Sequence, residues 1–152
     1  MKKIIIIATC LLLTGCLNNS SNISNNKTNR NNNKVEENEI KVDEIKVTIN
    51  NKVYKINLEK NKTVKEFINI LPKELTMNDL NDNEKYANLG ISLTTDSYYP
   101  KHIEKGDVML FGDNCLVIFY KSFDTEYDYT KIGHIDNLDD LGNGSIKAIF
   151  EK

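Results

Sequence analysis

The stretch that decides the fold reads EIKVTINNKVYKINL and covers residues 44–58. Apolar and polar side chains alternate on both sides of Asn50-Asn51, a pair that tolerates the backbone of a tight hairpin turn. A two-residue turn there sets three cross-strand pairs: Ile49 with Lys52, Val47 with Tyr54, and Ile45 with Ile56. Because this register places the apolar side chains on one face, the sequence predicts a β-hairpin with one buried side.

The hydrophobic period changes after the hairpin and becomes helical. Four apolar residues recur at positions i, i+3, i+4 and i+7, namely Val64, Phe67, Ile68 and Leu71. Thr63-Val64-Lys65-Glu66 fits a capping box at the start of this run, and Pro72 ends it. We expect one main helix whose apolar stripe closes one end of a β-barrel.

Further strands are predicted downstream, where short apolar runs are separated by glycine-containing turns. The expected strands cover residues 74–77, 85–89, 107–111, 115–121, 129–136 and 145–150. With the hairpin they make eight strands, and a short helical turn is expected over residues 138–141. Because closure removes exposed strand edges, the sequence predicts a mainly β fold, a closed eight-stranded antiparallel barrel with one main helix.

The N-terminus has the pattern of an export signal. Lys2 and Lys3 precede an apolar run over residues 4–13, which at about ten residues is too short to cross a bilayer as a helix. The run ends in Leu13-Thr14-Gly15-Cys16, which resembles the lipobox of bacterial lipoproteins. The resemblance implies that residues 1–15 are a cleaved signal peptide. It also implies that an acylated Cys16 anchors the protein in the bacterial cell membrane, facing the outside of the cytoplasm.

A tether is predicted over residues 16–43, between this anchor and a barrel domain over residues 44–152. Nine of the residues in 18–33 are Asn, and Ile23 is the single apolar side chain among them. Such a segment cannot bury enough apolar surface to offset the entropy of ordering, so we expect it to be disordered.

Charge argues against a nucleic-acid partner. The chain has 20 basic and 22 acidic residues, of which six and four precede residue 44. Residues 44–152 therefore carry 14 basic and 18 acidic side chains, a net charge of −4. A mildly acidic domain does not attract a phosphate backbone.

Cysteine usage leaves one thiol. Cys10 would leave with the signal peptide and Cys16 would be acylated, so Cys115 has no partner for an internal disulfide. Cys115 lies in an apolar strand pattern, and we interpret it as a small buried side chain rather than a nucleophile.

Four stretches of the predicted barrel carry a family resemblance, and they read LPKELTMND (71–79), EKGDV (104–108), NCLVIFYK (114–121) and KIGHID (131–136). With Glu84-Lys85, they resemble the bacterial cyclophilin-like domain family and occur in that family's order. The resemblance covers essentially all of residues 45–152 and implies the cyclophilin fold. It implies little about function, because the family is mostly uncharacterised. One departure is local, since the family often has Arg where this chain has His134.

The first enzymatic activity to consider is prolyl isomerisation. True cyclophilins use an arginine guanidinium, and a lysine does not replace its fixed fork of donors. The one arginine of this chain, Arg30, lies in the predicted tether, so we assign no catalytic residue. The alternative function, a peptidyl-prolyl cis-trans isomerase acting on exported proteins, rests on fold analogy alone. His102 and His134 lack metal-ligand spacing, so the sequence predicts neither a metal nor a cofactor.

Tyrosines are the remaining candidates for a binding site. Tyr98 and Tyr99 lie in a long segment over residues 91–105, and Tyr127 and Tyr129 follow later. Loops on a rigid barrel often carry binding surface, and tyrosine gives contact area at low entropic cost. The alternative is that these rings cover the barrel ends.

With His134, these tyrosines are the candidate residues for binding a small molecule or a peptide. The sequence therefore predicts a lipoprotein held to membrane lipid through Cys16. It presents a cyclophilin-like domain as a non-catalytic binding or accessory module.

Overall fold

The structure, a computed structural model, describes residues 42–152. The predicted signal peptide, the acylation of Cys16 and the predicted tether up to residue 41 lie outside these residues. Within them, no helix is long and apolar enough to cross a membrane.

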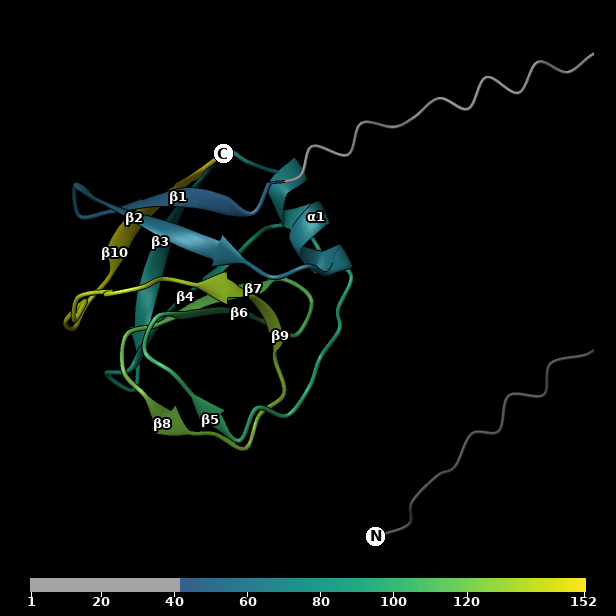
Figure 1. Cartoon of the computed structure of the whole chain (residues 1–152). Coiled ribbons are helices and arrows are strands. Elements are labelled where there is room, and N and C mark those ends of the chain that lie inside the picture. The colour runs from purple at the N-terminus through teal and green to yellow at the C-terminus, as the bar shows by residue number, and fades with distance from the viewer. Residues whose placement is uncertain (1–41) are drawn as a thin grey trace, which may run out of the picture. The chain divides into compact units, whose positions relative to one another are not determined.

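Eight antiparallel strands close into a barrel in the order β1-β10-β3-β4-β7-β6-β9-β2 (Figure 1). They are β1 (Glu44–Ile49), β2 (Lys52–Leu58), β3 (Lys73–Leu80), β4 (Glu84–Asn88), β6 (Asp107–Phe111), β7 (Cys115–Phe119), β9 (Thr130–His134) and β10 (Ile146–Glu151). The predicted fold class is confirmed, and each strand predicted after the hairpin is present, with ends that differ by at most three residues.

The β1–β2 hairpin has the predicted register. Its strands pair Ile49 with Lys52, Val47 with Tyr54 and Ile45 with Ile56. Asn50 and Asn51 have φ angles of 49° and 66°, the left-handed backbone that a two-residue hairpin turn requires. Ile45, Val47 and Ile56 are fully buried inside the barrel. The apolar face of the hairpin that the register predicts is therefore the one that faces the core.

The helix α1 (Lys62–Asn69) packs on the main core, and Figure 1 shows it at one end of the barrel. Phe67 is fully buried, and its ring meets Phe150 edge-on at 5.8 Å. The predicted capping box is wrong, because Asn61 is the N-cap and its side chain accepts from the Val64 amide at 2.8 Å. Thr63 is instead buried and donates through Oγ1 to the Thr94 carbonyl at 2.6 Å.

Two features of the loops differ from the sequence-based expectation. Residues 138–141 form no helical turn; Leu138 is buried, and Asp139 accepts from Lys52 and from the Tyr54 hydroxyl. These hydrogen bonds attach the segment to β2. A small second sheet was missed, in which β5 (His102–Ile103) pairs with β8 (Phe123–Asp124).

A lysine lies inside the barrel among apolar side chains. Lys85 is fully buried, and its ammonium donates to the Asp79 carboxylate and to the carbonyls of Gly142 and Gly144 at 2.5 and 2.8 Å. The Tyr120 hydroxyl also donates to Asp79, at 2.7 Å. These two donors hold the pKa of the Asp79 carboxyl below its usual value, the Lys85 bond contributing most. Every proton of the buried ammonium thus has an acceptor.

Candidate functional site

Two loop segments bring three of the four predicted tyrosines together. Tyr98 and Tyr129 form an antiparallel bridge, in which each amide donates to the other's carbonyl at 3.0 and 3.1 Å. Tyr127 and Tyr129 both lie against the ring of Phe111, with centroid separations of 6.0 and 5.6 Å. Tyr99 follows Tyr98 in the chain and is half exposed.

These rings lie on a second hydrophobic cluster, outside the barrel. Its buried members are Ile103, Met109, Val117, Phe119 and Tyr129. Successive side chains of a strand point to opposite faces, so Val117 and Phe119 of β7 face outward while Leu116 and Ile118 enter the main core. Phe119 meets Tyr129 edge-on at 5.5 Å, a favourable arrangement for aromatic pairs.

The exposed part of this region is named here the outer aromatic surface and is defined by Tyr98, Phe111 and Tyr127. These three residues are 44%, 45% and 62% exposed, respectively. Tyr129 is only 5% exposed, so it supports the surface from below rather than contacting a ligand directly. Exposed apolar side chains that adjoin one another, unlike scattered ones, are typical of interaction sites.

A carboxyl that the sequence analysis did not select lies on the same side of the barrel. Glu84 begins β4 and stands opposite Leu80 of β3 and Phe119 of β7. It is partly buried, and its carboxyl forms no hydrogen bond or ion pair within residues 42–152. Desolvation, and secondly the charge of Asp79, raise its pKa to about 7.

The negative charge of Glu84 contributes to raising the pKa values of two nearby groups in this cluster. The pKa values of the Cys115 thiol and the Tyr129 hydroxyl are raised, mainly by burial and secondly by Glu84. A thiol with a raised pKa is a poor nucleophile at neutral pH, which fits the interpretation of Cys115 as an apolar side chain. Asn83, the residue before Glu84, also lacks a donor: its Oδ1 is buried and accepts no hydrogen bond from the part of the chain that the structure describes.

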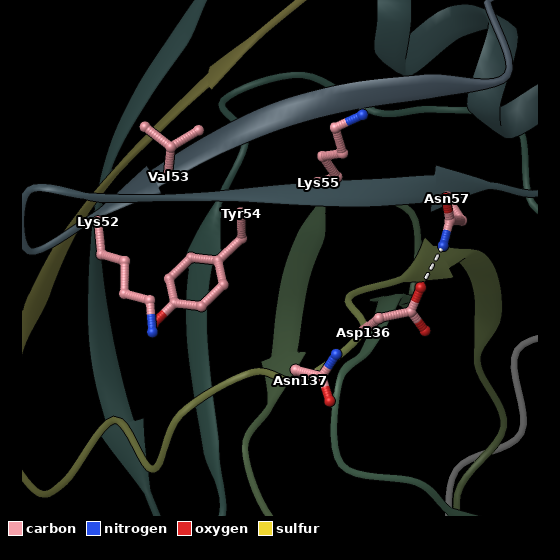
Figure 2. Close-up of a pocket in the computed structure, with 7 residues that line it drawn as sticks. All are labelled: Lys52, Val53, Tyr54, Lys55, Asn57, Asp136 and Asn137. Atoms are coloured by element: carbon pink, nitrogen blue, oxygen red, sulfur yellow. Dashed lines mark hydrogen bonds between the residues drawn. The ribbon is translucent and has the colours of Figure 1, made fainter.

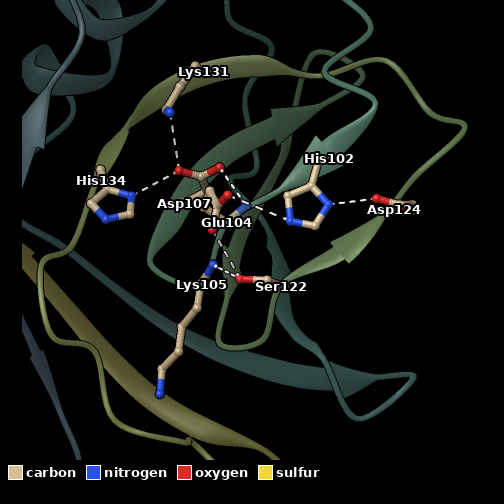
Figure 3. A network of polar contacts seen from close by, with 8 residues as sticks. All are labelled: His102, Glu104, Lys105, Asp107, Ser122, Asp124, Lys131 and His134. Carbon is tan, nitrogen blue, oxygen red and sulfur yellow. Dashed lines mark hydrogen bonds and ion pairs between the residues drawn. The ribbon is translucent and has the colours of Figure 1, made fainter.

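His134, the fifth candidate, lies apart from the tyrosines. It pairs with Asp107 at one end of β6, whereas Phe111 lies at the other end. Figure 3 shows Asp107 between His134 and Lys131, with Oδ1 at 2.9 Å from His134 Nδ1 and 3.2 Å from Lys131 Nζ. Asp107 is nearly fully buried, and Gly106 beside it leaves no room for a side chain, whose Cβ would lie 2.3 Å from the Ile135 carbonyl. His134 therefore serves a packed polar network.

His102 also pairs with a carboxylate, at the small second sheet. Its Nδ1 lies 2.6 Å from Asp124 Oδ1, and its Nε2 lies 3.6 Å from Glu104 Oε1 (Figure 3). The bond to Asp124 contributes most to raising the pKa of this exposed imidazole. No group of three or more ligating side chains within residues 42–152 is arranged to hold a metal ion.

A shallow hollow of about 340 Å³ lies elsewhere, between β2 and the turn at residues 136–137 (Figure 2). Its polar walls are already partnered: Asn57 donates to Asp136 at 2.8 Å, and Tyr54 and Lys52 both reach Asp139. The hollow is open to solvent and its lining is mostly exposed, so it offers a ligand little burial.

The fold defines the class, a small closed antiparallel β-barrel domain with one helix on its core. The family model described as the cyclophilin-like family matches residues 47–151, and the chain belongs to this family. Comparisons with curated proteins and with solved structures gave no match.

Proposed function

We propose that the protein is a membrane-anchored lipoprotein whose cyclophilin-like domain binds a ligand without catalysing a reaction. The observation that carries the binding role is the outer aromatic surface, where the rings of Phe111 and Tyr127 lie 6.0 Å apart and the two residues are 45% and 62% exposed. Burial of two such rings by a partner would remove a large apolar area from water.

Anchoring is supported by Leu13-Thr14-Gly15-Cys16 at the end of the short apolar run. Two acyl chains on one cysteine give stable attachment, because each buried CH₂ adds about 0.8 kcal/mol and one chain alone binds marginally. Mass spectrometry of the mature protein tests this, with a diacylglyceryl group expected on an N-terminal Cys16. Retention in the membrane fraction after Cys16→Ser would contradict it.

A non-catalytic role is supported by the absence of arginine from residues 42–152. A lysine ammonium is a flexible, strongly hydrated point charge and does not hold a fixed donor against an amide. Loss of one preorganised donor costs about 10²–10³ in rate. We expect no acceleration of prolyl isomerisation in a protease-coupled peptide assay. Saturable catalysis abolished by one substitution would favour the isomerase instead.

Binding is tested with a displayed library of random heptapeptides. The library is selected against the full chain and counter-selected against the Phe111→Ala/Tyr127→Ala double variant. We expect enriched peptides that bind the wild type at least about tenfold more tightly, the equivalent of about 1.4 kcal/mol. Enriched peptides that bind both proteins equally would place the ligand elsewhere and contradict the proposal.

A further inference from the structure

The barrel is closed unevenly on the two sides of β2. With β1 this strand pairs at every residue from Lys52 to Asn57, whereas with β9 it pairs only at Asn57 and Leu58. The Glu59 amide adds one further bond, to the Ile132 carbonyl at 2.9 Å. In the described part of the chain, the residues of β2 before Asn57 therefore have no strand on the side away from β1.

Two residues of this uncovered edge leave their backbone unpaired. A hairpin with a two-residue turn has a hydrogen-bonded pair next to the turn, so Lys52, Tyr54 and Ile56 bond to β1. Because this pattern alternates along a strand, the N–H and C=O groups of Val53 and Lys55 point away from β1. Neither backbone has a hydrogen-bond partner within residues 42–152, and Val53 is 59% exposed.

The hollow of about 340 Å³ lies along this edge (Figure 2). The chain after β9 turns at Asn137, whose φ is 55°, and in the described structure the hydrogen bonds that join this segment to β2 all come from side chains. Asn57 donates to Asp136 at one end, and Lys52 donates to Asp139 at the other end at 2.6 Å. The side chains around the hollow are thus partnered, while the backbone between its two ends is not.

Unpaired donors and acceptors on alternate residues match another extended main chain. An antiparallel strand exchanges an N–H···O bond in both directions with every second residue of its neighbour, which is the spacing of Val53 and Lys55. We propose that an extended segment of a partner protein adds to β2 as an antiparallel strand, pairing with these two residues. The site shares no residue with the outer aromatic surface, so it is independent of the function proposed above.

The side chains of the edge indicate the sequence of the added strand. Figure 2 shows Val53 and Lys55 on the side of β2 opposite to Tyr54, so both face outward. Side chains of paired strands contact the residue directly opposite. A β-branched residue fits opposite Val53, and an acidic residue fits opposite Lys55, whose exposed ammonium meets one carboxylate, that of Glu44, at 2.8 Å. In an antiparallel strand the acidic residue comes two positions before the β-branched one.

The experiment measures binding of acetyl-Ser-Glu-Thr-Val-Ser-amide to the ¹⁵N-labelled full chain by solvent-exchange NMR. Without peptide, the amides of Val53 and Lys55 should exchange freely, and saturation with peptide should slow their exchange at least about tenfold. The Tyr54 amide, already bonded to β1, should change by less than about twofold. Slow exchange at Val53 and Lys55 before peptide is added would mean that this chain or a second copy already covers the edge. That result would overturn the proposal.

N-methylation of the peptide supplies the matched control. A methyl group on the Val amide removes a donor that faces β2, whereas a methyl group on the Thr amide lies at the opposite edge of the peptide. We expect the first methylated peptide to bind at least about tenfold more weakly than the parent, because it loses a hydrogen bond and blocks close approach. The second should stay within about threefold of the parent. Equal weakening by the two methyl groups would exclude pairing through the main chain and overturn the proposal.

Val53→Pro tests the same bond from the protein side. The Val53 amide bonds neither neighbouring strand, and proline is tolerated where the N–H of an edge strand faces solvent. The variant should bind the parent peptide at least about fivefold more weakly, while Val53→Thr, which keeps the amide and the branched side chain, should stay within about twofold. The methylated peptides decide the point on the wild type, whatever the stability of Val53→Pro.

Phe111→Ala/Tyr127→Ala separates this site from the outer aromatic surface. The double variant should bind the parent peptide within about twofold of the wild type, because the two sites are independent. Loss of affinity in this variant would place the peptide on the outer aromatic surface and overturn the β2 site.

Discussion

Glu84 and Lys85 are adjacent in β4, both charged, and their side chains meet opposite environments. Lys85 enters the barrel, is fully buried, and donates to one carboxylate and two carbonyls. Glu84 faces outward and is partly buried, and its carboxyl forms no hydrogen bond or ion pair within residues 42–152. The strand alternation that separates them also separates the two hydrophobic clusters of the domain.

The difference shows which charge the fold has paired and which it has left unpaired. A buried charge is tolerated when every hydrogen-bonding position is filled, and its removal then leaves the partners unsatisfied. Lys85 meets that condition and holds the Gly142 and Gly144 backbone against the end of β3. The Glu84 carboxyl does not meet it, and desolvation, with the charge of Asp79 second, raises its pKa to about 7.

The largest effect is expected from Lys85→Met, which keeps the volume of the side chain and removes its charge. Asp79 and two buried carbonyls would lose their donor, so we expect the free energy of unfolding to fall by about 5 kcal/mol. Urea denaturation of the full chain measures it. Lys147→Met is the control, because Lys147 forms an exposed pair with Glu74 and should change stability by less than about 0.5 kcal/mol. Similar small losses in both variants would break the comparison.

Phe67→Ala tests the main core alone. Phe67 is fully buried in α1 against Phe150, so the substitution leaves a cavity at the end of the barrel. We expect a loss of about 3–4 kcal/mol, within the range for aromatic-to-alanine changes in cores. The same denaturation experiment applies, and a loss below about 1 kcal/mol would mean that α1 contributes little to the core.

Glu84→Gln should change how stability depends on pH. A carboxyl whose folded pKa lies near 7, above the unfolded value of about 4.3, stabilises the folded state below pH 4 and loses that contribution as pH rises to 7. Because Glu84 is partly exposed, we expect the contribution to be about 1–2 kcal/mol. The variant should be more stable than the wild type at pH 8 by that amount. Asp79, whose pKa is lowered, has the opposite dependence and loses its stabilising contribution in acid.

The smallest effect is expected from Tyr127→Ala. Tyr127 is the most exposed of the large apolar side chains of the outer aromatic surface, and its truncation should change the free energy of unfolding by less than about 0.5 kcal/mol. A stable variant that has lost peptide affinity would assign this ring to recognition. A loss above about 1.5 kcal/mol would instead make Tyr127 a structural cover of Phe111.

Local sequence determined most of the barrel. The turn at Asn50-Asn51 and the alternation around it specify the β1–β2 register, because a slip of one residue would turn the apolar side chains to solvent. The helical period from Val64 to Leu71 located α1, and the tyrosines marked two of the three exposed rings of the outer aromatic surface. These features depend on neighbours in the chain and are readable from it.

Only the tertiary structure decided the rest. Asn61 caps α1 in place of Thr63 because the Thr63 hydroxyl binds the distant Thr94 carbonyl. Phe111 joins the tyrosines because the Tyr98–Tyr129 bridge brings two separated loops to the end of β6. In β4 the alternation of the sequence marks two faces without saying which one lies inside. The fold turned Lys85 inward and left the Glu84 carboxyl outside without a donor. Asp79 is six residues from Lys85, but the Gly142 and Gly144 carbonyls are 57 and 59 residues away and reach its ammonium only in the folded barrel.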